Sequence, residues 1–210
     1  MGGCLPAAGI GVSDYIRTRF TPEPLSFRPD ILIFRPTPRS GLTAFLATEG
    51  RADTPPYWAY AWAGGAALAL YLQDHPEAVA GRSVLDFGAG SGLVAIAAAK
   101  AGGRVSAFEP DPLGQVALRL NAEANGVGIA LAGAQAEAEV VLAGDVFYDG
   151  AVASRTLPAL RANAARGASV LVGDPYRKDL PERALTLLAE FQVPDMGGGV
   201  VRAGVFAMRP

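Results

Sequence analysis

A glycine-rich loop is the first stretch of this sequence that could do chemistry. The apolar run Val84–Phe87 leads into Gly88, Gly90 and Gly92, and an apolar helical pattern follows at once. Glycines at the start of a helix let a ligand approach the backbone, and the first helical turn offers free N–H groups and a partial positive charge. The spacing therefore predicts a small-molecule site between a strand and a helix.

Two acids near this loop narrow the choice of ligand. The dinucleotide-binding fingerprint G-x-G-x-x-G would need its third glycine at position 93, where this chain has Leu93. Asp86 precedes the first glycine, where it would repel a pyrophosphate but suits a ligand with an ammonium group. Glu109 ends the next predicted strand, where an acid can accept hydrogen bonds from both hydroxyls of a ribose. S-adenosylmethionine (AdoMet) has that ammonium group and carries no phosphate, so we predict AdoMet rather than NAD as the cofactor.

The stretch Gly144–Gly150, GDVFYDG, is the second candidate for chemistry. It follows a short apolar run, so it would lie at the carboxyl end of a buried strand, beside the ligand crevice of an α/β sheet. We expect the rings of Phe147 and Tyr148 to be exposed and to hold an ammonium group by cation–π contacts. Asp145 would position, through a hydrogen bond, an amine that accepts the methyl group of AdoMet. Asp149 would either attract a cation or cap the next helix. The other interpretation of the whole stretch is a surface turn with a helix cap.

Strands and helices alternate regularly around these motifs. Regular alternation predicts an α/β fold with a mostly parallel, Rossmann-like sheet and helices on both faces. The last two strands, joined by a Gly-rich turn at 195–199, predict an antiparallel hairpin at one edge. The pattern predicts helices over 62–72, 91–101, 112–125, 151–166 and 181–190, and seven strands over 83–87, 104–109, 129–131, 139–143, 169–173, 191–193 and 200–208.

The first part of the chain differs in composition from the rest. It is rich in Pro and Gly, with a helical segment at 14–20 and a possible strand at 31–34. We expect residues 1–56 to form an N-terminal extension packed on the core, and residues 57–210 to form a single globular domain. The total of 210 residues, half of them hydrophobic and 18% charged, suits one compact α/β protein.

Composition also argues against several classes of protein. A net charge of −2 gives no sign of a phosphate-binding surface and disfavours a nucleic-acid partner. One cysteine, Cys4, and one histidine, His75, cannot make an intrachain disulfide or a Cys/His zinc site, so we predict no metal. The N-terminus lacks the features of a signal peptide, and the longest apolar stretch, 59–72, is short for a membrane span. We expect a cytoplasmic protein that does not enter a membrane.

These motifs together resemble a known family. VLDFGAGSG over 84–92, FEPDP over 108–112 and LRLNAEANGV over 118–127 are similar to class I, seven-β-strand methyltransferases. With PPYWAYAWAGGAALALYL over 55–72 and GDVFYD over 144–149, the chain resembles a narrower group, the family 16 protein-lysine methyltransferases. Within that family it is most similar to the lysine methyltransferases of the electron transfer flavoprotein β subunit and their bacterial homologues.

The resemblance covers about residues 55–180 and implies an AdoMet-dependent protein-lysine N-methyltransferase. The implied acceptor is the electron transfer flavoprotein β subunit, with a ribosomal stalk protein as a further acceptor in bacteria. The resemblance also implies that Trp58 and Trp62 help to cover the cofactor, while core packing is the alternative for both. Two rival functions stay open. One is an N-methyltransferase whose acceptor is a small molecule, either a nicotinamide-like pyridine or a free amine, and the other is a non-catalytic module that binds AdoMet. The sequence does not indicate an oligomeric state.

The segment GDPYRKDLP over 173–181 offers two more polar candidates. It faintly resembles a motif of base amino-methyltransferases, but it follows the fifth strand rather than the fourth, which disfavours nucleic-acid base methylation. Asp174 and Arg177 either line the substrate side, as the resemblance suggests, or pair with each other on the rim.

The resemblance also implies a contact with the adenine of AdoMet. Many class I methyltransferases place a polar or acidic side chain after the third strand to bind the adenine amine, and only Gln135 and Glu137 are available there.

Three polar residues near the second strand receive structural interpretations. Asp111 precedes Pro112 and is predicted to cap a helix. Asn121 and Asn125 lie one turn apart on that helix and are predicted to support the fold.

Overall fold

The computed structural model describes residues 11–195 and 199–209, so the segment with Cys4 and most of the Gly-rich turn at 195–199 lie outside the described residues. None of the helices within these ranges is long and apolar enough to cross a membrane. The helices are α1 (Val12–Arg19), α2 (Leu42–Thr48), α3 (Ala63–Asp74), α4 (Leu93–Lys100), α5 (Pro112–Ala124) and α6 (Gly150–Ala165), with short 3-10 turns η1 (Tyr57–Ala59), η2 (Pro76–Ala78) and η3 (Glu182–Ala184). The strands are β1 (Phe20–Leu25), β2 (Arg28–Pro36), β3 (Ser83–Phe87), β4 (Arg104–Phe108), β5 (Ala130–Leu131), β6 (Val140–Gly144), β7 (Ser169–Asp174), β8 (Leu185–Pro194) and β9 (Val200–Met208).

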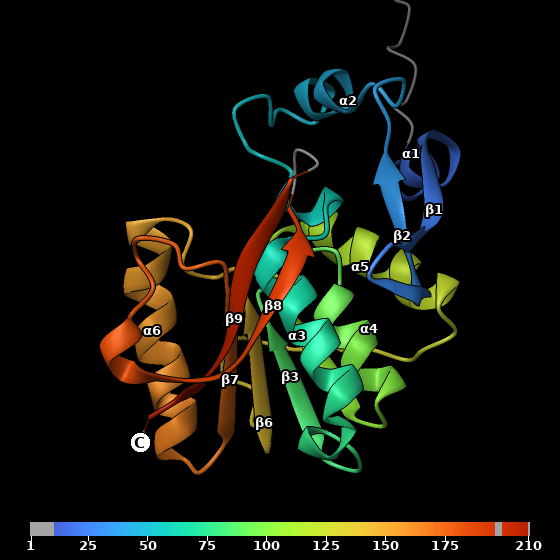
Figure 1. Ribbon diagram of the computed structural model, residues 1–210. Coiled ribbons are helices and arrows are strands. Elements are labelled where there is room, and N and C mark those ends of the chain that lie inside the picture. Colours follow the sequence, from blue (N-terminus) through green and yellow to red (C-terminus); the bar gives the residue numbers. More distant parts are fainter. Residues whose placement is uncertain (1–10, 196–198, 210) are drawn as a thin grey trace, which may run out of the picture.

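Seven of these strands form one mostly parallel sheet in the order β5-β4-β3-β6-β7-β9-β8 (Figure 1). Strand β9 runs antiparallel to both of its neighbours, so the predicted hairpin at one edge is confirmed. The predicted α/β fold with a seven-stranded sheet is confirmed as well. Because β4 and β6 flank β3 on opposite sides, the strand order reverses at β3, and the carboxyl end of such a strand is where open α/β sheets bind ligands.

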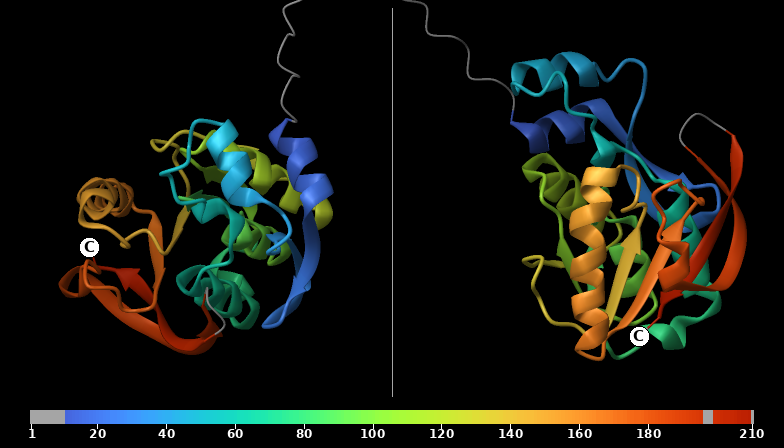
Figure 2. Two further views of the ribbon diagram at one scale, coloured as in Figure 1. Left: turned by 90° about the horizontal axis from the view of Figure 1, so that it is seen from above. Right: turned by 90° about the vertical axis from the view of Figure 1, so that its left-hand side faces the viewer.

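Alternate side chains of the strands build a separate apolar layer on each face of the sheet. Val84 and Leu142 pack into the layer beneath α3 and α4, whereas Leu85 and Val141 pack into the layer beneath α6. This period of two follows from the pleat of a strand, which sends neighbouring side chains to opposite faces. Figures 1 and 2 show α3 and α4 on one side of the sheet and α6 on the other. The prediction of helices on both faces is therefore confirmed.

The helix predicted over 181–190 is wrong. Only η3 forms there, and the chain continues as β8 in register with β9 from Leu185 opposite Met208 to Pro194 opposite Val200. The Ala, Leu and Glu residues of this segment favour a helix locally, but a helix this short has little stability of its own. Pairing with β9 satisfies the backbone and buries Leu185 and Val193, so tertiary pairing overrides local propensity.

Strands β1 and β2 form a second, two-stranded sheet beside α5, and neither β1 nor α2 was predicted (Figure 1). Asn121 of α5 and Asn125, the C-cap residue of that helix, hold this hairpin by its free edge. Asn121 Oδ1 accepts a hydrogen bond from Phe34 N at 2.8 Å, and Asn125 Oδ1 accepts one from Leu32 N at 2.9 Å. Both asparagines therefore have the structural role that was predicted. The division of the chain at residue 56 stays a prediction.

Candidate functional site

The glycine loop after β3 has a backbone that favours glycine at each of its three marked positions. Gly88, Gly90 and Gly92 have φ values of 79°, 53° and 81°, in the left-handed region that strains other residues. A Cβ at Gly88 would lie 3.1 Å from Val146 Cγ1, and one at Gly92 would lie 3.0 Å from Leu118 Cγ. These three positions therefore present backbone alone, which lets a small ligand approach the loop closely.

Glu109 lies directly against this loop. Its carboxylate accepts a hydrogen bond from Gly90 N at 2.6 Å and another from Asp111 N at 2.8 Å. The side chain is buried, and burial raises the pKa of Glu109 above its usual value. Gly114, which was not predicted, makes room for it, because a Cβ there would lie 2.9 Å from Glu109 Cγ. The structure thus brings the predicted ribose-binding acid and the glycine loop together.

Asp86 lies on the face of β3 that packs against α4, and it holds the first turn of that helix. Its carboxylate accepts a hydrogen bond from Ala95 N at 2.9 Å, in the first turn of α4. The N-cap residue Gly92 has no side chain to do this, so a strand residue replaces the missing cap. Asp86 is 1% exposed, and burial raises its pKa to about 7.

The two tryptophans of the aromatic segment have different surroundings. Trp58 is 3% exposed, and its ring stacks on Phe20 with centroids 6.2 Å apart, which is the core-packing alternative. Its backbone nevertheless passes over the loop, since a Cβ at Gly90 would lie 3.9 Å from Trp58 Cα. Trp62 is half-buried and donates from Nε1 to Tyr57 O at 2.8 Å. The Trp62 ring is the more open of the two, and it belongs to an aromatic group that it forms with Tyr57 and Tyr148.

That group is completed by two exposed tyrosines. Tyr148 and Tyr57 are 39% and 41% exposed, with ring centroids 4.7 Å apart, and Tyr57 lies 5.8 Å from the Trp62 ring. Tyr57 was missed, although its place in PPYWAYAW beside two candidate rings was a usable signal. The expectation of an exposed Phe147 is wrong. Its ring is fully buried in the apolar layer beneath α6, in the same cluster as Val146 and Leu160.

Asp145 connects three elements at the carboxyl edge of the sheet. Its φ of 58° is left-handed, its Oδ2 accepts a hydrogen bond from Gly65 N at 2.7 Å, and its Oδ1 pairs with Arg177. Trp62, the N-cap residue of α3, offers no side-chain acceptor, so Asp145 fills that role. Burial raises the pKa of Asp145, while Arg177 and the N–H groups of α3 oppose the shift. Asp149 caps α6 by accepting from Ala151 N at 2.8 Å, the alternative that the sequence left open.

The first turn of α3 comes close to Asp145 because glycines lie on both sides of its contact with the sheet. A Cβ at Gly64 would lie 2.2 Å from Gly173 O, and a Cβ at Gly144 would lie 3.0 Å from Gly65 Cα. The first turn of α3 therefore packs on the bare backbone of β6 and β7. The pair of glycines at 64–65 was the sequence signal for this close approach.

Asp174 and Arg177 pair with each other, as one interpretation had it, but Asp174 does not lie on the rim. Asp174 is fully buried, and its Oδ1 accepts a hydrogen bond from Arg177 N at 2.7 Å. Arg177 Nη1 lies 3.8 Å from Asp174 Oδ2 and also pairs with Asp145. Burial raises the pKa of Asp174 to about 6.

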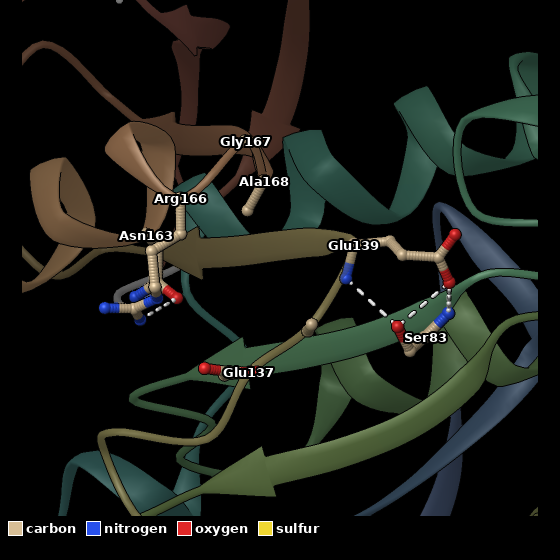
Figure 3. Close-up of a pocket in the computed structure, with 8 residues that line it drawn as sticks. Ser83, Glu137, Glu139, Asn163, Arg166, Gly167 and Ala168 are labelled. Carbon is tan, nitrogen blue, oxygen red and sulfur yellow. Dashed lines mark hydrogen bonds between the residues drawn. The ribbon is translucent and has the colours of Figure 1, made fainter.

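Two hollows lie away from the glycine loop. One, of about 560 Å³, lies at the amino ends of β3, β6 and β7 and is lined by residues such as Ser83, Glu137 and Arg166 (Figure 3). Glu137, a candidate for the adenine contact, thus lies at the opposite edge of the sheet. The other hollow, of about 840 Å³, is lined by residues 36–60 around α2 and borders Tyr60, whose ring is 6.1 Å from that of Trp62.

Comparisons with known proteins fit this architecture. A model of the ribosomal protein L11 methyltransferase (PrmA) family matches residues 67–154. The structure is similar to the crystal structure of ribosomal protein L11 methylase from Lactobacillus delbrueckii subsp. bulgaricus. The TM-score is 0.50 and the identity 20%, with 68% of this chain and 77% of that chain covered. The chain has a methyltransferase fold. The glycine loop, Glu109 and the 145–149 segment therefore lie at the crevice edge of a methyltransferase-like sheet.

Sequence relatives of this methyltransferase fold point to a narrower group. The chain is 40% identical over 153 residues to the electron transfer flavoprotein beta subunit lysine methyltransferase of Danio rerio, covering 67% of this chain and 59% of that protein. It is also 40% identical over 131 residues to the Homo sapiens protein of the same name, covering 58% and 50%. These matches confirm the resemblance that the motifs indicated. The chain spans between half and 60% of the lengths of these two relatives.

Proposed function

We propose that this protein is an AdoMet-dependent protein-lysine N-methyltransferase. The observation that carries the proposal is the convergence of four features at one edge of the sheet: the glycine loop, Glu109, the aromatic pair Tyr57–Tyr148 and Asp145. The acceptor we propose is the electron transfer flavoprotein β subunit, which the names of the relatives support. A ribosomal stalk protein is the second candidate acceptor, and a cytoplasmic location stays a prediction.

The residues at the crevice fit AdoMet. The left-handed glycines leave room for a ligand against the backbone, and the Glu109 carboxylate at the end of β4 is placed to accept from ribose hydroxyls. Trp62 and Tyr57 would cover the ligand from η1 and the start of α3. AdoMet, when bound, supplies an activated methyl group. The chain's contribution on this side is to bind and orient, because a correctly placed donor and acceptor gain several kcal/mol from proximity.

The acceptor side must hold a lysine and release a proton. The attacking amine has to be neutral, although a free lysine has a pKa of about 10.4. The exposed faces of Tyr57 and Tyr148 can hold an ammonium group or its methylated product by cation–π contacts worth roughly 0.5–2 kcal/mol. Asp145 serves as an anchor for the amine rather than as a strong base, because its charge favours the ammonium form. Water then takes the proton.

Two rival functions make different predictions. A small-molecule N-methyltransferase would keep the same cofactor site but would accept a pyridine or a free amine. A non-catalytic module would bind AdoMet and act through protein contacts. The buried carboxylates at the crevice speak against the module, since burying charge costs stability without benefit to a surface that only binds proteins.

The test is to incubate the purified protein with tritiated AdoMet and a cell extract, followed by mass spectrometry of the labelled bands. We expect label in a lysine-containing peptide, with strong reduction in a Glu109→Ala control that removes the predicted ribose contact. Label confined to small molecules would support the first rival. AdoMet binding by calorimetry without any transfer would support the second.

A further inference from the structure

Two buried carboxylates and one arginine form a compact group at the carboxyl ends of β6 and β7. Asp145 follows β6, Asp174 ends β7, and the strands are joined there by Asp145 N donating to Gly173 O at 2.9 Å. Asp145 is 8% exposed and Asp174 is fully buried. The Arg177 guanidinium lies between them, paired with Asp145 and 3.8 Å from Asp174 Oδ2. The group therefore holds two acids for one cation.

The arginine does not satisfy both acids. Asp174 Oδ2 is buried and has no hydrogen-bond partner among the described residues, although a guanidinium carries five N–H donors. A buried polar atom without a partner is costly, and such atoms in native structures call for an explanation. The free oxygen is aimed toward the place that Arg177 occupies. The site is thus built for a cation that can donate to both carboxylates at once.

Asp145 keeps its orientation without help from Arg177. Its second oxygen is held by Gly65 N at 2.7 Å, at the positive end of α3. The arginine, by contrast, is attached to a loop, and its neighbour Tyr176 has a left-handed φ of 62°. The Arg177 side chain is also the most exposed of the three, at 21%. An external cation would reach the two acids along the path that this side chain now fills.

We propose that Asp145 and Asp174 form the binding site for the acceptor's cationic group, and that Arg177 fills this site from within when no acceptor is bound. The acceptor amine would enter by displacing the guanidinium, so that Arg177 tunes how tightly an acceptor binds. The identity of the cation as a lysine rests on the proposed function, whereas the existence of a cation site does not. An organic cation is favoured, since the described residues contain no group of three or more acids, histidines or cysteines arranged to hold a metal ion.

The first test is chemical rescue of Arg177→Ala, measured by thermal unfolding. Methylguanidinium chloride, which replaces the lost head group, should raise the unfolding midpoint by roughly 3–5 °C at about ten times its Kd. n-Butylammonium chloride, which resembles a lysine side chain, should do the same, whereas neutral N-methylurea should not. The control is Arg17→Ala, which removes an exposed arginine from its 2.6 Å pair with Glu123 and should show no rescue.

Two outcomes would overturn the site. Equal effects of the cations on Arg177→Ala and Arg17→Ala would mean that the effect is not specific to this place. If the cations still raise the unfolding midpoint of the double variant Arg177→Ala with Asp174→Asn, then Asp174 is not part of the site and Asp145 is the sole partner of the cation. If Arg177→Ala does not fold, Arg177→Met keeps the apolar stem and allows the same titration with n-butylammonium.

The second test uses transfer kinetics and separates this inference from the proposed function. In Arg177→Met we expect the KM for a lysine acceptor to fall several-fold with kcat kept, because the internal competitor is gone. A raised KM or a lowered kcat would instead show that Arg177 supports the acceptor site. If the wild-type protein methylates no lysine at all, the proposed function fails while the rescue experiment still decides the cation site.

Discussion

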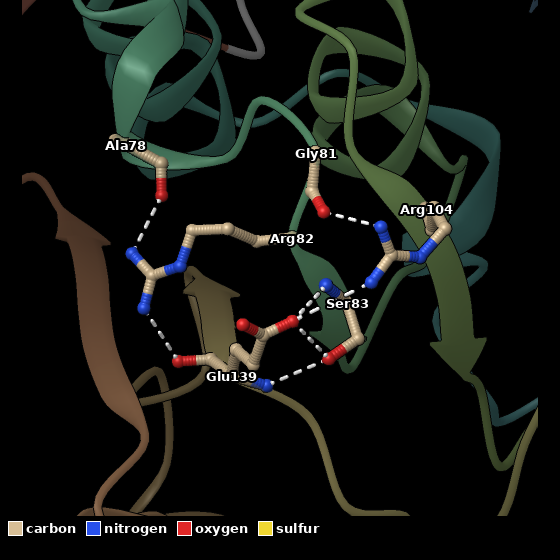
Figure 4. Close-up of polar contacts among 6 residues, drawn as sticks. All are labelled: Ala78, Gly81, Arg82, Ser83, Arg104 and Glu139. Atoms are coloured by element: carbon tan, nitrogen blue, oxygen red, sulfur yellow. Dashed lines mark hydrogen bonds and ion pairs between the residues drawn. The ribbon is translucent and has the colours of Figure 1, made fainter.

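We call the side of the seven-stranded sheet where its parallel strands start the amino edge, and the side where they end the carboxyl edge. Both edges carry charged side chains, but in different surroundings. At the amino edge, Glu139 accepts from Ser83 N at 2.7 Å and from Ser83 Oγ at 2.9 Å, and Arg104 lies 3.6 Å away (Figure 4). Arg82 donates to Ala78 O at 3.0 Å and to Glu139 O at 3.1 Å. The side chains of Glu139 and Arg104 are more than half exposed, so water and salt screen their attraction.

At the carboxyl edge the charges are buried. Asp86, Glu109, Asp145 and Asp174 are each less than 9% exposed, and burial raises the pKa of every one of them. The acid at the amino edge shows the opposite, because hydrogen bonds from Ser83 lower the pKa of Glu139. Natural proteins keep buried charge of this kind mostly where function needs it. The amino edge therefore fastens strands together, and the proposed site lies at the carboxyl edge.

The largest expected effect comes from Asp145→Asn. This change leaves the partly exposed Arg177 guanidinium with Asp174 alone, at 3.8 Å, and should cost about 1–3 kcal/mol of unfolding free energy. We expect methyl transfer to fall by roughly 100-fold, because the acceptor loses its anchor. Urea unfolding, calorimetry with AdoMet and the tritium assay measure stability, binding and transfer separately.

A double variant separates chemistry from folding at this position. Asp145→Asn with Arg177→Met removes this ion pair and should regain part of the lost stability, while Asp174 keeps its hydrogen bond from the backbone N–H of residue 177. AdoMet binding should persist in it while transfer stays low. Loss of AdoMet binding together with transfer, in a double variant that is folded, would instead make Asp145 a cofactor or folding residue.

The second prediction concerns pH and Asp86. Its pKa rises from 3.8 in the unfolded chain to about 7 in the folded protein, so between these values the folded protein binds more protons. Its contribution to stability is therefore full below about pH 4 and is lost as the pH rises to 7. At about 1.4 kcal/mol per pKa unit, wild type should lose up to about 4 kcal/mol relative to Asp86→Asn. Urea unfolding of both proteins at pH 4.5, 6 and 7.5 tests this, and parallel curves would contradict it.

The smallest effect is expected at the amino edge, from Glu139→Gln. Because the pKa of Glu139 is lowered, its contribution is present above its usual pKa and is lost as the pH falls, opposite in sign to Asp86. The side chain is exposed, so the urea midpoint should shift least among these variants, and AdoMet binding and transfer should match wild type. A loss of transfer in Glu139→Gln would break the comparison, since it would extend the chemistry to the edge that we assign to structure.

Local patterns predicted the cofactor side of the site better than the acceptor side. The glycine loop and Glu109 were identified because each requires a certain residue type at a strand end, and strand ends of a parallel sheet meet at one edge. The exposure of Phe147 was predicted wrongly because nothing in GDVFYDG tells which ring turns inward. Tyr57 and Arg177 come from segments far along the chain, and only packing shows that they lie beside Tyr148 and Asp145.

The sequence by itself determined the alternation of strands and helices, the glycine loop and the strand-end acids, because these depend on neighbouring residues and on the period of the apolar pattern. Only the tertiary structure decided that 181–190 is largely strand rather than helix, since pairing with β9 outweighs local propensity. It also decided that Asp86 and Asp145 hold the first turns of α4 and α3, and that Asp174 keeps an oxygen without a partner. These features depend on burial and on distances between remote segments, which no local pattern contains.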